Sequence, residues 1–72
     1  MKLKYDLSVD ALYISFKKGP TQVTTIRLTD DVSVDLGPKE EISGIEILSA
    51  SEHLGFLKKK QPKVELENVQ PA

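Results

Sequence analysis

Apolar side chains recur at every second position in four stretches of this chain. The stretches are Leu3/Tyr5, Leu12/Ile14/Phe16, Val32/Val34/Leu36 and Ile45/Ile47. Such alternation is typical of β-strands that bury only one face of a sheet. It predicts strands at residues 2–6, 11–16, 32–36 and 42–48. The β-branched but polar stretch at residues 21–28 predicts a further strand, at a sheet edge or with a wet face.

Gly44 interrupts the last predicted strand. Glycine inside a strand weakens it, so it predicts a β-bulge or a close approach of another part of the chain. A bulge at Gly44 would let Ile42 share a face with Ile45 and Ile47, despite the odd spacing.

A helix is predicted to follow the last strand. Ser49 and Glu52 stand at the spacing of a capping box, in which both side chains bond backbone N–H groups at the start of a helix. We expect the helix to run to about Leu57, with Gly55 as a weak point. The predicted fold class is α+β: a five-stranded, mostly antiparallel β-meander with one C-terminal α-helix packed on one face.

Residues 1–60 form the predicted single domain, and residues 61–72 a C-terminal tail or exchange arm. The arm carries only three large apolar residues, Val64, Leu66 and Val69, between two prolines. With 72 residues, one core of this size rarely supplies more than about 3–5 kcal/mol without a staple. The chain has no cysteine and one histidine, so disulfides and cysteine-ligated zinc sites are excluded. We therefore expect a homodimer and no cofactor.

The net charge of −1 gives no general attraction to nucleic acid or to a membrane surface. The only basic run, Lys58 to Lys60 with Lys63, lies beside two glutamates and has no aromatic residues interleaved. Nucleic-acid binding through it is the last-ranked hypothesis. The N-terminal residues do not read as a signal peptide, and no stretch reaches membrane-spanning length, so we expect a cytoplasmic protein without a membrane partner.

Three carboxylates are the candidates for chemistry. Asp35 and Glu46 point away from the core face of neighbouring predicted strands, and Asp10 stands at the start of the second strand. Carboxylates held close together can bind a hard cation or share a proton. The alternative is that Asp10 is a turn residue and the other two face water. His53 has no nucleophile or orienting carboxylate in a recognisable arrangement, so no catalytic residue is predicted.

Two parts of the sequence resemble a known family: the run from Tyr5 to Ile14, and Val34-Asp35 together with Gly44-Ile45-Glu46-Ile47-Leu48. Over about residues 2–55 the chain is similar to the small prokaryotic family named domain of unknown function 2283. The resemblance implies a similar sheet-plus-helix fold and no established activity. Because genes of this family often stand beside those of small proteins suspected of being toxins, it also implies an antitoxin-like or partner-binding role by association.

These observations favour a non-enzymatic, homodimeric protein-interaction module, antitoxin-like if its partner is a small cognate protein. Its basis is the small core, the open sheet edges and the arm, because an exposed edge accepts a strand from a second chain. The alternative is a metal-dependent enzyme or cation-binding protein that uses Asp10, Asp35 and Glu46.

Overall fold

The structure, a computed structural model, describes residues 1–17 and 22–58. The predicted tail or exchange arm at 61–72 lies outside these residues. The elements are β1 (Lys2–Asp6), β2 (Ala11–Ser15), β3 (Thr24–Arg27), β4 (Val32–Leu36), β5 (Ile42–Ile47), helix α1 (Ala50–His53) and 3₁₀ helix η1 (Gly55–Lys58). The predicted α+β fold is confirmed, and the bounds of β1 and β4 agree with the alternation to the residue.

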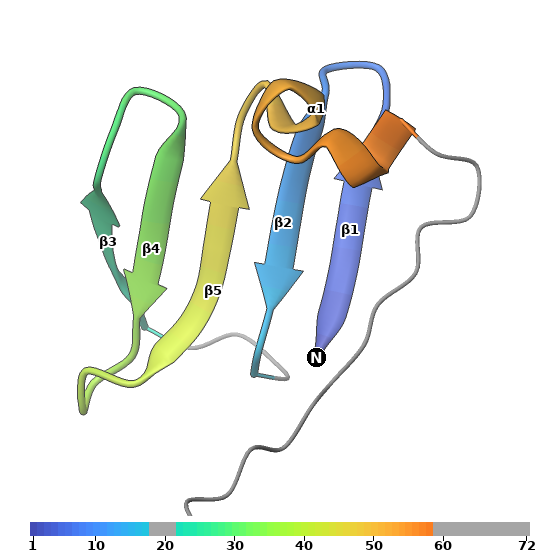
Figure 1. The fold of residues 1–72 in the computed structure, drawn as a ribbon. Coiled ribbons are helices and arrows are strands. Elements are labelled where there is room, and N and C mark those ends of the chain that lie inside the picture. Colours follow the sequence, from blue (N-terminus) through green and yellow to red (C-terminus); the bar gives the residue numbers. More distant parts are fainter. Residues whose placement is uncertain (18–21, 59–72) are drawn as a thin grey trace, which may run out of the picture.

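The five strands form one antiparallel sheet in the order β1-β2-β5-β4-β3 (Figure 1). The order departs from a continuous meander at one place, because β5 and not β3 pairs with β2. The strand that contains Gly44, β5, is therefore the central strand and pairs with β2 on one side and β4 on the other. The polar strand β3 lies at one edge, as its composition predicts, and β1 lies at the other.

The register sorts the side chains into two faces. One row crosses all five strands through Leu3, Ile14, Ile45, Val34 and Ile26, and we call its side of the sheet the apolar face. The next row, one residue along each strand, contains Lys4, Tyr13, Glu46, Ser33 and Arg27 and marks the polar face. Alternation in the sequence has thus become a two-sided sheet.

A bulge lies in β5, displaced by one residue from its predicted position at Gly44. The register with β4 shifts between Asp35, opposite Gly44, and Leu36, opposite Ile42, so that Ser43 is the extra residue. Its hydroxyl donates to the carbonyl of Asp35 at 3.3 Å. Because Leu36 belongs to the apolar face, the bulge brings Ile42 to that face, as predicted.

The predicted helix is too long and its predicted cap is wrong. Helix α1 ends at His53, and a separate 3₁₀ turn begins at Gly55. Ser49 has φ 49°, in the left-handed region, and its side chain makes no capping hydrogen bond. An N-cap side chain normally bonds from an extended backbone conformation, so Ser49 does not satisfy the capping box.

Little of the chain is fully buried. Among the described apolar residues only Leu12, at 1% exposure, and Ala50, at 0%, are buried. The helical segment covers the apolar face at one end of the sheet only, near β2 and β1 (Figure 1). Nine large apolar side chains are exposed: Met1, Leu3, Leu7, Val9, Phe16, Val23, Ile26, Leu28 and Ile42.

Candidate functional site

Asp10 anchors the helical segment to the first hairpin. Its carboxylate accepts hydrogen bonds from the Tyr5 hydroxyl, from the backbone N–H of Ser51 at 3.0 Å and from the Ser51 hydroxyl at 2.8 Å. Its carbonyl accepts one from the N–H of Ala50 at 2.8 Å. Asp10 has φ 53°, a conformation that aspartate adopts more readily than most residues. The cap of α1 therefore comes from a residue 41 positions away.

The same bonds perturb both acids of this pair. The hydrogen bond from Tyr5, followed by that from Ser51, lowers the pKa of Asp10, and the positive charge of Lys58 adds to the effect. In return, the bond to Asp10 raises the pKa of the Tyr5 hydroxyl. Asp10 is thus held as a carboxylate and Tyr5 as a neutral donor, which suits a structural clamp.

A second tyrosine–aspartate pair spans the polar face. Tyr13 on β2 lies across Gly44 on β5 and donates its hydroxyl to Asp35 on β4 at 2.8 Å. Thr25 on β3 donates to the other oxygen of Asp35 at 2.6 Å. Three strands therefore contribute to one network over a fourth. A Cβ added at Gly44 would overlap the Tyr13 hydroxyl and ring, so glycine is required for the close approach predicted from the sequence.

The polar-face network also favours the protonated phenol. The hydrogen bond to Asp35 raises the pKa of Tyr13, partial burial adds to this, and the negative charges of Asp35 and Glu46 act in the same direction. Tyr13 is therefore a poor candidate for an activated nucleophile or base at neutral pH. It acts as a donor that joins strands.

The three candidate metal ligands are not gathered into one site. Asp35 and Glu46 share the polar face near Tyr13, whereas Asp10 is bonded to Tyr5, whose neighbour across the hairpin is the buried Leu12 of the apolar face. Within residues 1–17 and 22–58, no group of three or more His, Cys, Asp or Glu is placed to hold a metal. Cation binding by these residues stays a prediction of the sequence.

His53 has a partner that the sequence did not reveal. Its Nε2 lies 2.9 Å from a carboxylate oxygen of Asp31, in the turn between β3 and β4. The two side chains are 45% and 35% exposed. The pair joins α1 to the turn between β3 and β4 at the protein surface, and it forms an ion pair when the imidazole is protonated.

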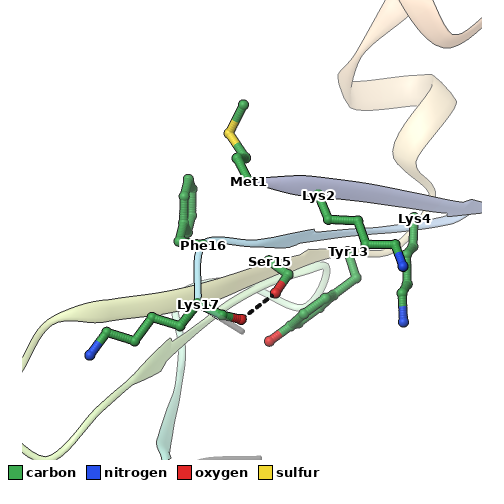
Figure 2. A pocket seen from close by; sticks show the side chains of 7 residues that line it. All are labelled: Met1, Lys2, Lys4, Tyr13, Ser15, Phe16 and Lys17. Carbon is green, nitrogen blue, oxygen red and sulfur yellow. Dashed lines mark hydrogen bonds between the residues drawn. The ribbon is translucent and has the colours of Figure 1, made fainter. Parts of the chain in front are cut away.

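A hollow of about 490 Å³ lies at the end of β1 and β2. Figure 2 shows Met1 and Phe16 on one side of the sheet there, with Lys2, Lys4 and Tyr13 on the other. Lys17, at its rim, donates to Glu41 at 2.7 Å, and this bond lowers the pKa of Glu41. The hollow thus straddles both faces and is lined on its polar side by surface lysines.

The larger feature is the open part of the apolar face. Leu3, Phe16 and Ile26 are each 43% exposed, and Ile42 is 51% exposed, although all stand on the side of the sheet that should be buried. Sequence reasoning placed Leu3, Phe16 and Ile42 on the buried side, but not Ile26, and expected one helix to pack on that side. Helix α1 has only four residues, and together with η1 it covers the face at one end of the sheet (Figure 1).

A family model described as "Protein of unknown function (DUF2283)" matches residues 2–51. The chain belongs to this family. The DUF2283 match confirms the resemblance seen in the sequence, and it includes both tyrosine–aspartate pairs, Gly44 and Ser51. No curated protein and no solved structure matches the chain.

The described part of the chain contains no helix long and apolar enough to cross a membrane.

Proposed function

We propose that this chain is a homodimeric protein-interaction module, and that the open part of the apolar face is where the second copy packs. The observation that carries the proposal is the incomplete core: two of the described apolar side chains are buried, and four on the apolar face are 43% exposed or more, namely Leu3, Phe16, Ile26 and Ile42. A single sheet with a one-turn helix leaves apolar surface exposed to water, and a partner that packs on this surface would bury it.

The rest of the chain offers too little to cover this face. Residues 18–21 contain no large apolar side chain, and residues 59–72 contain Val64, Leu66 and Val69. These three side chains are too few to cover the row from Leu3 to Ile26 and the exposed apolar residues beside it. A second copy brings an apolar face of equal size.

The face suits contact with its own copy. Its central row carries only Leu, Ile and Val, and no charged side chain belongs to it. A two-fold axis places the same patch on both partners, so a neutral patch meets no like charge. Two sheets packed face to face interdigitate such side chains in a layer about 10 Å thick.

The proposal includes the cytoplasm as location and a small cognate protein as a second partner. Small secreted domains usually depend on disulfides, and this chain has no cysteine. The cognate protein is supported only by what the family resemblance implies by association. A metal-dependent activity has no comparable support, because Asp10 and Asp35 are engaged by different partners.

The test is the mass of the full-length protein in solution, measured by sedimentation equilibrium over a range of concentrations. We expect twice the protomer mass of 8.0 kDa. Leu3→Lys places an ammonium group in the proposed interface and should raise the dimer dissociation constant more than about tenfold, which corresponds to about 1.4 kcal/mol.

The matched control is Leu7→Lys, the same substitution in the turn after β1, where the side chain is 80% exposed. It should leave the dimer intact. A wild-type chain that stays monomeric at every concentration contradicts the proposal. Equal weakening by both variants contradicts the assignment to the apolar face.

A further inference from the structure

The outer edge of β3 is a second exposed feature of the sheet, separate from the apolar face. β3 is an edge strand whose residues are all exposed, and within the described residues no strand pairs with its outer side. The N–H of Leu28 donates to Val32 on β4 at 2.8 Å. Backbone groups alternate along an antiparallel strand, so Ile26 also faces β4, while the N–H and C=O groups of Thr25 and Arg27 face outward.

The side chains at this edge leave those backbone groups accessible. Thr25 is turned toward Asp35 at 2.6 Å, and Arg27 donates to the carbonyl of Asp30 at 3.1 Å. The opposite edge, β1, carries Lys2 and Lys4, and lysine is a residue that discourages strand addition at edges. The segment that β3 presents, Thr24–Arg27, has neither lysine nor proline.

We propose that residues 61–72 of a second copy add to this edge as a sixth strand. The inference builds on the proposed homodimer and names a further contact in it. The sequence Val64-Glu65-Leu66-Glu67 alternates with the period of a strand. Placed beside β3, Val64 and Leu66 extend the apolar face next to Ile26, and the glutamates extend the polar face next to Arg27.

A second copy suits this contact better than the same chain. The helical segment ends near β1 (Figure 1), and Asp10, which bonds Ser51 of this segment, is also bonded to Tyr5 of β1. A strand added outside β3 would lie five strand spacings from β1, about 24 Å. The six residues from Lys58 to Val64 reach only about 20 Å when fully extended. The direct route also crosses the face that the second copy would cover.

The test uses cysteine pairs in the full-length chain, which has no cysteine of its own. A chain with Arg27→Cys is mixed with chains carrying one cysteine at position 64, 65, 66 or 67, oxidised, and the mixed disulfide dimers are quantified by mass spectrometry. Because only polar-face positions of an added strand lie beside residue 27, Glu65→Cys and Glu67→Cys should give several-fold more mixed dimer than Val64→Cys and Leu66→Cys.

The control replaces Arg27→Cys by Lys4→Cys, on the same face at the opposite edge. Equal yields at all four positions, or equal yields with Lys4→Cys, would overturn the strand addition. A disulfide that forms within single chains of the Arg27→Cys/Glu65→Cys double variant, in place of mixed dimers, would overturn the second copy as its source.

The sedimentation experiment separates this inference from the proposed function. If Leu3→Lys dissociates the dimer and the alternating disulfide pattern is absent, the strand addition is wrong and the contact through the apolar face stands. If the alternating pattern appears but Leu3→Lys leaves the mass in solution unchanged, the contact through the apolar face is wrong and the strand addition stands.

Discussion

The two faces of the sheet are held in different ways. On the polar face, Tyr13 and Thr25 reach across strands to one carboxylate, Asp35, so their hydrogen-bonding groups are satisfied within the chain. On the apolar face, Leu12 is buried beneath the helical end, while Ile42 at the other end is 51% exposed. The network of Tyr13, Asp35 and Thr25 is satisfied within the chain, whereas the apolar face is covered at one end only.

This contrast supports the proposed contact through the apolar face. A network in which each acid already has two or more donors has little left to offer a ligand. An apolar surface left in water gains free energy from any partner that covers it, by about 25 cal/mol per Å². In this proposal the hydrogen-bonded polar residues hold the fold, and the aliphatic residues of the apolar face carry the interaction.

The largest effect should come from Leu12→Ala at the closed end of the apolar face. A fully buried leucine truncated to alanine loses about 2–5 kcal/mol, from lost burial and the cavity left behind. Urea denaturation should show this loss of unfolding free energy at low protein concentration. Ile42→Ala, on the same face but half exposed, is the control and should cost clearly less there. Equal costs would mean that the two ends are equally closed.

The next effect should come from the polar face, through Gly44→Ala. The new methyl displaces the Tyr13 ring and breaks its bond to Asp35, which should cost about 1–3 kcal/mol of unfolding free energy. Gly55→Ala is the control, because a Cβ there meets nothing within 4 Å.

A double-mutant cycle tests the cause of that cost. In a Tyr13→Ala background the cost of Gly44→Ala should largely disappear, since the two residues then no longer collide. An unchanged cost in that background would show that the close approach of Tyr13 is not why glycine is needed.

Much of the sheet could be predicted because alternation is a local property. The strands at Lys2–Asp6 and Val32–Leu36, the edge position of β3 and the special role of Gly44 all follow from the sequence. The place of β5 between β2 and β4 could not be predicted, because no residue pattern distinguishes one apolar neighbour from another.

The helix and the site were harder because they depend on distant contacts. Ser49 and Glu52 have the spacing of a capping box, but the N–H of Glu52 bonds the carbonyl of Ser49, and Asp10, far away in the chain, accepts from the N–H groups of Ala50 and Ser51 instead. Sequence reasoning took Asp10 and Asp35 as candidate cation ligands or, in the alternative, as a turn residue and a water-facing residue. Their tyrosine partners come from the pairing of strands, which a linear pattern does not show.

The smallest effect should be the pH dependence of the stability that Asp10 contributes where the helical segment packs on the apolar face. Hydrogen bonds from Tyr5 and Ser51 hold the pKa of Asp10 below its ordinary value of 3.8. The stability that this carboxylate contributes is therefore complete above the ordinary value and is lost as pH falls through the lower, folded pKa. In Asp10→Asn, the unfolding free energy should lack this part of the acid dependence.

The shift itself can be followed by NMR titration of the Asp10 carboxyl carbon. Ser51→Ala removes the second-ranked donor, so the pKa of Asp10 should move toward 3.8 while the bond from Tyr5 persists. Tyr5→Phe should move it further, because the tyrosine bond is the larger cause. If neither substitution moves the titration, the clamp does not hold Asp10 in solution, and the closed end of the apolar face is kept by Leu12 and Ala50 alone.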